Sequence, residues 1–413
     1  MQVELKQASS RIADTRESRG DMGYAVRISL VAAIGGFLFG FETAVISGAE
    51  KTIQQLWNLS SGWQGFTVAS SLIGTVIGSI VAGMPAQKYG RKKVLTVIAI
   101  MYLFSAIGCA LTSVWILFIT FRFIGGLAVG ASSVVGPMYI SEVAPPKVRG
   151  RLAGSFQLMI VAGIFTAYLT NFLFVDFGDT GWRWMLGIMI IPAGLFAIFL
   201  RFIPESPRWL VLNNKDAEAK TIFERTGEPN AAALIREEHE LSKGGIKESL
   251  FNGKYGKPIL YAVLLAMFNQ LSGINAILYY APRIFEMAGF DKADSYLQPV
   301  YIGAANLLFT IIAMTVIDKF GRKTLLLVGC VGLVAFLGLT AHAFSGETMG
   351  KNVLFYLLGY IAFFAFSQGA VLWVFVSEIF PNSVRSQGSS LGSFTHWIMA
   401  AIISWTFPII VEG

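Results

Sequence analysis

The 413-residue chain has little charge for its length, because only 14% of its residues are Asp, Glu, Lys or Arg. An ordinary soluble protein carries roughly 25%. At the same time 54% of the residues are hydrophobic, and 33 of them are Phe. One soluble core cannot hide that much apolar surface. The composition therefore excludes an ordinary soluble protein and indicates a protein with several membrane spans.

Cysteine and histidine are also scarce. The only two cysteines, Cys109 and Cys330, lie far apart in apolar runs, which excludes a disulfide framework and favours small core residues. The three histidines, His239, His342 and His396, have no metal-ligand spacing. No carboxylate pair, nucleophile elbow or phosphate-binding loop is visible. The sequence therefore predicts no metal site, no cofactor and no enzyme activity.

Eleven apolar stretches are long enough to cross a bilayer as helices, which takes about 20 residues. A polar stretch, 204–257, separates six of them from the other five. We therefore expect an all-α membrane protein with a six-helix bundle (1–203), a linker with amphipathic helices (204–257) and a second bundle (258–413). The predicted spans are 24–48, 64–84, 94–112, 115–138, 152–174, 182–203, 258–281, 299–317, 324–344, 352–376 and 389–411.

The basic residues show which way the spans run. With the N-terminus in the cytoplasm, 26 of the 32 Lys and Arg fall on cytoplasmic segments. This bias predicts a cytoplasmic N-terminus by the positive-inside rule. It also accounts for the net charge of +7 without nucleic acid, because the charge lies beside anionic lipid.

Two motifs occur twice in the same order. Tyr89–Lys92 follows the second span and Phe320–Lys323 follows the eighth, while Ser141–Arg149 follows the fourth and Ser377–Arg385 follows the tenth. The offsets are 231 and 236 residues. This agreement predicts a parallel duplication of a six-helix unit, the arrangement of a two-bundle transporter. The second bundle is then expected to have a sixth helix, so the sequence reads as truncated after its eleventh.

The repeated turns carry charges at the predicted cytoplasmic ends of the helices. One interpretation is positive-inside anchoring. The functional one is a set of ion-pair latches that hold the halves closed inside and break when the cavity opens inward. The latch residues would be Gly90, Arg91, Glu142, Arg149, Glu205, Arg208, Asp318, Arg322, Glu378 and Arg385.

Glu42 in the first span and Arg122 in the fourth are predicted to be the only ionisable residues well inside the N-terminal spans. Either charge alone in hydrocarbon would cost several kcal/mol, so we expect the two to pair. The pair is either a structural salt bridge or a proton site. A carboxylate beside a cationic Arg stays ionised, and it can take a proton when the Arg moves away.

Amide and aromatic side chains gather in otherwise apolar spans, mainly in the second half. Single intramembrane amides usually hold helices together. So many in corresponding helices favour a ligand site, since amides both donate to and accept from hydroxyl groups. The residues are Gln157, Asn269, Gln270, Asn275, Tyr279, Tyr280, Asn306, Trp373, His396 and Trp397.

Three motifs resemble those of the sugar porters of the major facilitator superfamily. They are Pro204–Leu210, Gln270–Asn275 with Tyr279 and Tyr280, and Trp373 followed by Ser377–Pro381. The family includes bacterial xylose–proton and galactose–proton symporters and animal glucose facilitators. The resemblance implies twelve helices in two bundles, a central sugar site and alternating access.

The resemblance also implies roles for residues at matching positions. Glu42 stands where proton-coupled members have an Asp, with Arg122 as its partner, and an acid there favours symport. Asn269 and His396 depart from the usual Gln and Gln or Asn at the sugar site. Gln157, Gln270, Asn275 and Asn306 would bind sugar hydroxyls, Trp373 would lie under the ring, and Phe39, Tyr279, Tyr280 and Trp397 would line or gate the cavity.

Together these observations predict a secondary active transporter that imports a monosaccharide, a hexose or a pentose, by proton symport. It would act as a monomer in the bacterial inner membrane, with lipid, sugar and protons as its partners. A sugar uniporter and a non-transporting sugar sensor stay open as alternatives. The sequence does not name the sugar.

Overall fold

The computed structural model describes residues 21–228, 230–244, 248–345, 351–381 and 383–412. This part of the chain is helical and contains no strand. Eleven of its helical segments are long and apolar enough to cross a membrane. They coincide with the eleven predicted spans to within a few residues at most ends, so the predicted all-α membrane fold is confirmed. The largest difference is the first span, which runs eight residues further than predicted, to Leu56.

The first six spans are formed by six helical segments, the last of them divided into short pieces. A short helix, α4, joins the second span to the third. The bounds are α2 (Met22–Leu56), α3 (Ser61–Val81), α4 (Gly83–Tyr89), α5 (Arg91–Leu111), α6 (Trp115–Val143), α7 (Arg149–Phe174), η1 (Gly178–Thr180), α8 (Gly181–Gly187), α9 (Ile190–Phe199) and η2 (Leu200–Phe202).

Three short helices follow outside the spans, and five further spans come after them. The three are α10 (Pro207–Leu212), α11 (Asp216–Thr226) and α12 (Ala231–Gly244). The five spans are built from α13 (Gly256–Leu271), α14 (Ile274–Met287), α15 (Lys292–Phe320), α16 (Arg322–Ser345), α17 (Lys351–Phe364), η3 (Ala365–Gly369), α18 (Ala370–Glu378) and α19 (Arg385–Glu412).

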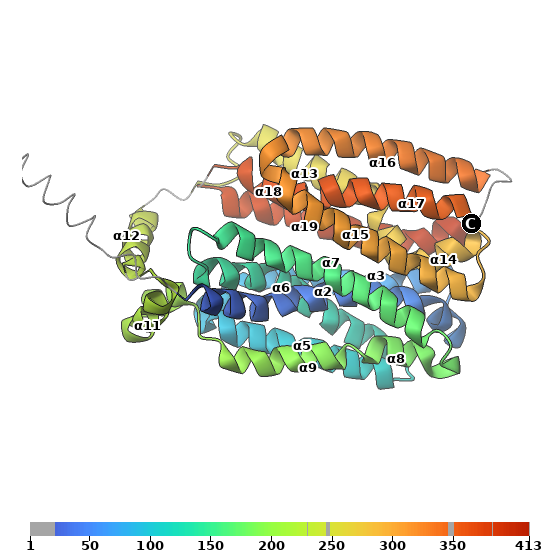
Figure 1. Cartoon of the computed structure of the whole chain (residues 1–413), viewed down its shortest axis with the longest axis horizontal. Coiled ribbons are helices and arrows are strands. Elements are labelled where there is room, and N and C mark those ends of the chain that lie inside the picture. Colours follow the sequence, from blue (N-terminus) through green and yellow to red (C-terminus); the bar gives the residue numbers. More distant parts are fainter. Residues whose placement is uncertain (1–20, 229, 245–247, 346–350, 382, 413) are drawn as a thin grey trace, which may run out of the picture.

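The spanning helices run roughly along one direction (Figure 1). Helices α2 to α9 lie together, α13 to α19 lie beside them, and α11 and α12 project at one end. We call that end the linker end and the opposite one, where α8 and α14 lie, the far end. Residues from both groups share one continuous hydrophobic core.

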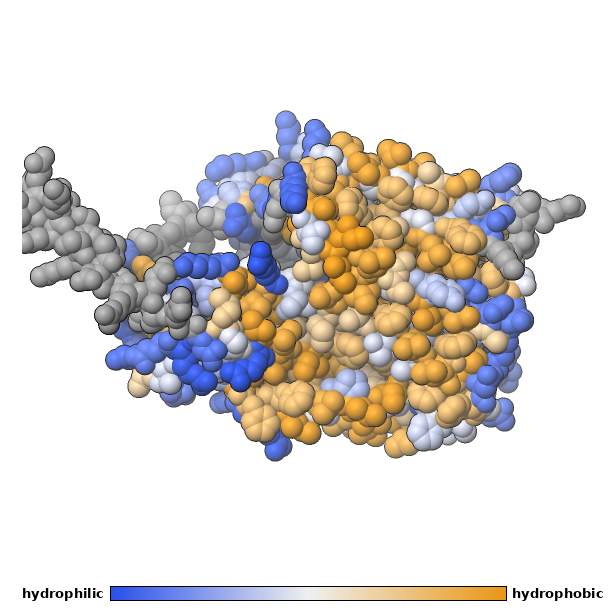
Figure 2. All heavy atoms as spheres, viewed as in Figure 1, coloured by the Kyte–Doolittle hydropathy of each residue, from blue (hydrophilic) through white to orange (hydrophobic). Residues whose placement is uncertain are grey.

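On the face shown in Figure 2, a broad apolar belt lies between two polar ends. Large side chains in this belt face outward, for example Phe104, Val331 and Phe355, and Val331 is 73% exposed. Water would penalise such a surface, whereas the hydrocarbon of a bilayer does not. A helix can satisfy its backbone hydrogen bonds internally, as a membrane-spanning segment must. Cys330 also lies exposed on α16, so it is not the core residue that the sequence indicates, while Cys109 is buried.

Two of the predicted spans are broken near their own middles. In the seventh span, Gly273 has a left-handed φ of 86° between α13 and α14, a conformation that glycine adopts without steric cost. Tyr280 then leaves helical geometry, just before Pro282. In the tenth span, the π-helix η3 interrupts the path from α17 to α18. Such irregular turns often occur at functional sites.

The linker is attached to both groups of helices. The Trp209 indole of α10 donates to the carbonyl of Gln87 at 2.8 Å. At the other end of the linker, Glu248 accepts hydrogen bonds from the Tyr255 hydroxyl and from Ser383 Oγ, the latter at 3.0 Å. The Tyr255 hydrogen bond is the main reason that the pKa of Glu248 is lowered. The described residues of the linker therefore contact both halves of the molecule.

Small residues let the helices of the first group approach closely. A Cβ added at Gly126 on α6 would overlap the carbonyl of Ser71 on α3, and one added at Gly163 on α7 would overlap the carbonyl of Phe37 on α2. Helix association in membranes depends on such close packing, because apolar side chains gain little by leaving lipid.

Gly126→Ala should therefore lower the stability of the folded protein, by roughly 1–3 kcal/mol, because the added methyl group forces α3 and α6 apart. The matched control is Gly194→Ala on α9, where an added Cβ meets nothing. The melting temperature of each variant in detergent is measured by size-exclusion chromatography after heating. Equal melting temperatures would show that the α3–α6 crossing does not limit stability.

Candidate functional site

Two opposite charges meet in the interior of the first group of helices. Arg122 Nη1 on α6 lies 2.5 Å from Glu42 Oε1 on α2, and the side chains are only 1% and 5% exposed. The same nitrogen lies 3.5 Å from the carbonyl oxygen of Glu42. The structure thus brings together the two ionisable residues that the sequence expects to pair.

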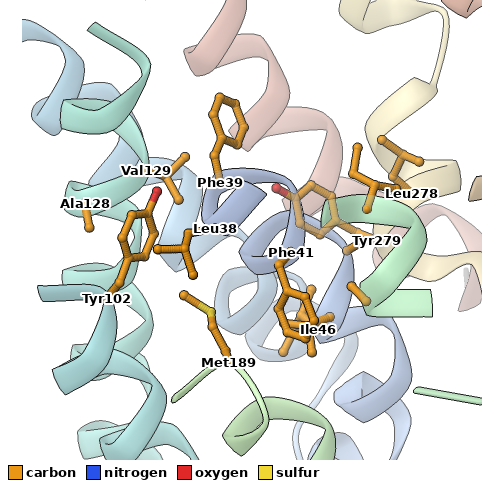
Figure 3. Packing of buried hydrophobic residues seen from close by; sticks show 14 of the residues in the cluster. Leu38, Phe39, Phe41, Ile46, Tyr102, Ala128, Val129, Met189, Leu278 and Tyr279 are labelled. Carbon is orange, nitrogen blue, oxygen red and sulfur yellow. The ribbon is translucent and has the colours of Figure 1, made fainter. Parts of the chain in front are cut away.

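Buried polar atoms beside the pair lack protein partners. Among the described residues, Arg122 Nε and Nη2 are buried without one, and the hydroxyl groups of Tyr102 and Ser132 lie close to each other nearby. Figure 3 shows Tyr102 beside Leu38 and Val129, close to α2. Buried polar groups need partners, so these donors are free to bind water beside the carboxylate. Such a setting suits a group that exchanges protons.

A second cluster is centred on Gln270, the next-to-last residue of α13. Its Oε1 accepts a hydrogen bond from Asn275 Nδ2 at 2.8 Å. Its Nε2 lies 3.1 Å from Asn269 Oδ1 and 3.0 Å from Nε2 of His396 on α19. All four side chains are buried. The break at Gly273 places Gln270 and Asn275 on either side of a turn, which is why residues five apart share a hydrogen bond.

Aromatic rings line the same cluster. The His396 ring lies 4.8 Å from Trp373 and 4.9 Å from Trp397, measured between ring centroids. Trp397 in turn lies 5.6 Å from Phe39 on α2. Amide groups next to flat rings can hydrogen-bond a hydroxyl-rich ligand and cover its apolar face. Because Phe39 belongs to the first group of helices, the cluster reaches across the contact between the two groups.

Three other predicted site residues lie apart from this hydrogen-bonded set. Tyr279 is buried and projects from α14 toward helix α2 (Figure 3). Asn306 is buried on α15, and Gln157 is half-buried on α7. Among the described residues, neither amide hydrogen-bonds to the Gln270 cluster. Their side chains are thus positioned on separate helices that a ligand would have to bridge.

Tyr280 has contacts of a different kind. Its hydroxyl donates to the carbonyl of Ser404 at 2.8 Å, and its ring stacks on Phe407 at 4.8 Å, both on α19. It has no exposed surface. These contacts describe an anchor between α14 and α19, whereas the sequence predicts a cavity-lining residue.

Three of the predicted latch residues, Arg91, Glu142 and Glu205, form one network at the linker end. Arg91 Nη2 lies 2.8 Å from Glu142 Oε1. Glu205 accepts from the backbone N–H groups of Arg91 and Lys92 at 2.8 and 2.9 Å. The turn before Arg91 needs Gly90, which has a φ of 98° and lies against the Glu205 carboxylate.

The second half repeats part of this network, with Arg322 Nη2 lying 3.2 Å from Glu378 Oε1. Arg149 and Arg385 each approach a backbone carbonyl five residues earlier, at 3.4 Å. Arg208 is half-buried on α10. The side chain of Asp318 lies outside the described residues. The latch contacts described here join residues of the same half, whereas the sequence predicts latches that hold the two halves together.

One functional-site candidate is missing from the sequence prediction. Glu50 lies on α2, is fully enclosed, and forms an ion pair with Arg283 of α14. The predicted first span ends at residue 48, two residues before Glu50, so the prediction about ionisable residues well inside the spans does not cover it. The signal was present, because no helix breaker separates Glu50 from the first apolar stretch and the helix simply continues to Leu56.

Comparisons with known proteins match the chain to a transporter family. Residues 28–413 match the family model described as sugar (and other) transporter. The chain is 35% identical to the arabinose–proton symporter of Bacillus subtilis, covering 95% of this chain and 87% of that protein. It is 38% identical to a D-xylose transporter of Levilactobacillus brevis, covering 92% and 85%.

Solved structures of transporters also match the chain. The partially occluded inward-open form of the xylose transporter XylE from E. coli matches with a TM-score of 0.83 and 34% identity, covering 94% of this chain and 92% of that one. These relatives are transporters, and their resemblance extends over nearly the whole chain. The protein therefore belongs to the sugar porter family of the major facilitator superfamily.

Proposed function

We propose that this protein imports a monosaccharide together with a proton by alternating access. The observation that carries the proposal is the buried Glu42–Arg122 pair, because a purely structural role does not call for unsatisfied donors around a carboxylate. In support, relatives named above are a proton-coupled arabinose symporter and a xylose transporter. A pentose or a hexose is the substrate class that fits.

Proton coupling follows from the chemistry of the pair. Ionised Glu42 attracts Arg122, whereas a protonated carboxyl loses most of that attraction. Protonation therefore frees α2 to move relative to α6. Phe39, three residues before Glu42, lies against Trp397 of the Gln270 cluster. A shift of α2 would thus be transmitted directly to the sugar site.

Sugar would bind between the bundles 1–203 and 258–413, which move relative to each other. Gln270, Asn275, Asn269 and His396 would hydrogen-bond its hydroxyl groups, with Trp373 and Trp397 against the ring. Binding would replace hydrogen bonds that these side chains now make with one another, such as Asn275 Nδ2 to Gln270 Oε1. Gln157, Asn306 and Tyr279 would complete the site from neighbouring helices.

The distribution of contacts between the halves supports a cavity that opens toward the linker end. At the far end, side chains of α2 and α3 bind side chains of α14 and α19. At the linker end, the described latch pairs stay within one half. With the basic linker end in the cytoplasm, as the positive-inside rule indicates, this is an inward-facing form that releases sugar into the cell.

Glu42→Gln should abolish accumulation of sugar against its gradient while leaving sugar exchange intact, because an amide cannot carry the proton. Proteoliposomes with an imposed inward proton gradient, supplied with labelled arabinose, xylose, glucose or galactose, measure both activities. Glu224→Gln, an exposed acid on α11, is the control and should behave like the parent.

The same assay separates the alternatives. If Glu42→Gln still concentrates sugar, the proton is carried elsewhere. If the parent protein only equilibrates sugar, with or without a protonophore, it is a uniporter and the Glu42–Arg122 pair is structural. Sugar binding without flux would identify a sensor.

Gln270→Ala should weaken sugar binding by about ten- to a hundredfold, because it removes hydrogen bonds to the ligand and leaves Asn275 and His396 without their shared partner. Gln55→Ala, an exposed amide on α2, is the matched control. Isothermal calorimetry with each sugar measures the affinities. Unchanged affinity in Gln270→Ala would place the sugar site elsewhere.

The orientation can be tested on intact cells. In a Cys330→Ser background, Lys292→Cys at the far end should react with a membrane-impermeant maleimide, and Lys220→Cys on α11 should react only after lysis. Both positions are exposed, so a reversed pattern would overturn the cytoplasmic assignment of the linker end.

A further inference from the structure

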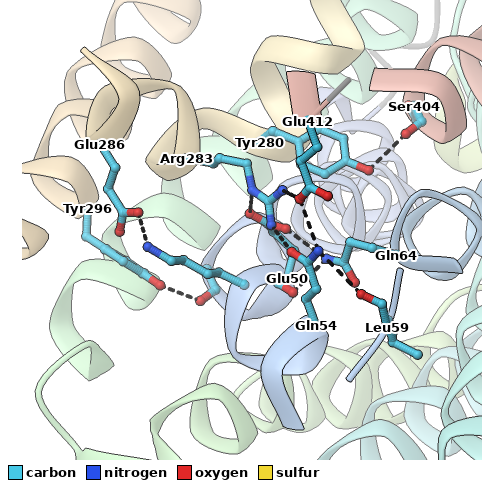
Figure 4. Close-up of polar contacts among 12 residues, drawn as sticks. Glu50, Gln54, Leu59, Gln64, Tyr280, Arg283, Glu286, Tyr296, Ser404 and Glu412 are labelled. Atoms are coloured by element: carbon cyan, nitrogen blue, oxygen red, sulfur yellow. Dashed lines mark hydrogen bonds and ion pairs between the residues drawn. The ribbon is translucent and has the colours of Figure 1, made fainter. Parts of the chain in front are cut away.

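An ion pair joins the two halves at the far end of the molecule (Figure 4). Arg283 Nε of α14 lies 3.0 Å from Glu50 Oε1 of α2, and the side chains are 11% and 1% exposed. Neither residue belongs to the proton pair or to the proposed sugar site. The charges come from helices on opposite sides of the contact between the halves.

Neighbouring side chains complete the hydrogen bonding of the pair. Gln64 of α3 donates to the other oxygen of the Glu50 carboxylate at 2.8 Å. Arg283 also binds Gln54 of α2 and lies 3.3 Å from Glu412 of α19. Buried charges persist only when they are paired and hydrogen-bonded in this way. The arrangement therefore specifies one closed geometry of the far end.

Other polar contacts cross between the halves nearby, and the other ion pair that joins α2 to α14 is more exposed. Lys51 pairs with Glu286 of α14, with the Lys51 side chain 48% exposed. Ser61 Oγ donates to Glu412 at 2.6 Å, and the Tyr296 hydroxyl donates to the carbonyl of Gly48 at 2.7 Å. Exposed ion pairs contribute little stability, so the Glu50–Arg283 pair is the dominant charged link.

Both helices of this link lead to the functional sites. Glu50 is eight residues beyond Glu42 on the uninterrupted helix α2, a rise of roughly 12 Å. On α14, Asn275 and Tyr279 lie one turn apart before the kink at Tyr280, and Arg283 follows shortly after it. A movement at the proton pair is therefore carried to the link along the continuous helix α2, and the sugar site is connected to the link through the kinked helix α14.

We propose that Glu50 and Arg283 form a lock that holds the far end shut, and that this lock must break each time the cavity opens to the far side. The inference rests on the proposed alternating access. It adds that a second buried carboxylate, separate from Glu42, makes the state with the far end closed the more populated one at rest.

Solvation determines which of the two states, closed or open, is destabilised more when one charge of the lock is removed. In the closed state, loss of Arg283 leaves Glu50 buried without a counter-charge, and loss of Glu50 leaves Arg283 with only the more exposed Glu412. Both changes are unfavourable. In the open state water solvates the remaining charge. Loss of either partner therefore destabilises the closed state more than the open one and shifts the population toward the open one.

The test uses spin labels at Asp179→Cys and Lys292→Cys, exposed positions at the far end of each half, in a Cys330→Ser background. Pulsed electron–electron distance measurements in lipid nanodiscs report the spacing of the two halves. Glu50→Gln and Arg283→Gln should each raise the long-distance population by about tenfold.

Lys51→Gln is the matched control, because it removes the neighbouring exposed pair and should leave the distance distribution close to that of the parent. The double variant Glu50→Gln/Arg283→Gln should shift less than the two single shifts combined, since no charge is left unpaired. If Glu50→Gln fails to fold, Glu50→Asp, which keeps the charge, takes its place in the distance measurement.

The parent distribution in both single variants would overturn the lock, as would an equal shift in Lys51→Gln. The measurement needs neither sugar nor a proton gradient. A failure here is therefore distinguishable from a failure of the proposed symport, which the Glu42→Gln transport assay decides.

Discussion

A charge in the interior of a membrane protein has to be paired, and helix α2 carries two such charges. Glu42 binds Arg122 within the first half, and Glu50 binds Arg283 of the second half. An unpaired charge at that depth costs several kcal/mol, so each pair restricts the position of α2 relative to one neighbour. The long, unbroken form of α2 then makes the two restrictions mechanically dependent on each other.

In the second half, broken helices bring amide side chains together. On a regular helix, amide side chains would point in successive directions and would bind one another or lipid-facing neighbours. The left-handed residue at Gly273 and the π-helix η3 instead bring Gln270, Asn275 and the carbonyl of Gln368 toward one place. Irregular backbone is tolerated at membrane depth only where protein or water surrounds it, which is the condition that a binding cavity provides.

The two ends of the molecule hold the halves differently. At the far end, ion pairs and hydrogen bonds cross from one half to the other, whereas the ion pairs described in the repeated turns at the linker end, Arg91–Glu142 and Arg322–Glu378, each lie within one half. Proteins that alternate between two openings need contacts that can be exchanged at both ends. The internal duplication supplies equivalent turns at the linker end, but the far-end contacts have no repeated motif in the sequence.

Sequence alone determined the spans, the duplication and the family, because hydrophobic length and motif spacing are local properties of the chain. It also predicted that Glu42 would meet Arg122, since a single acid and a single base in hydrocarbon leave few alternatives. Only the tertiary structure decided that Tyr280 packs against α19, that the latch pairs among the described residues each lie within one half, and that Glu50 meets Arg283. These outcomes depend on which helix faces lie opposite each other, and residues 233 positions apart leave no local pattern from which that pairing can be read.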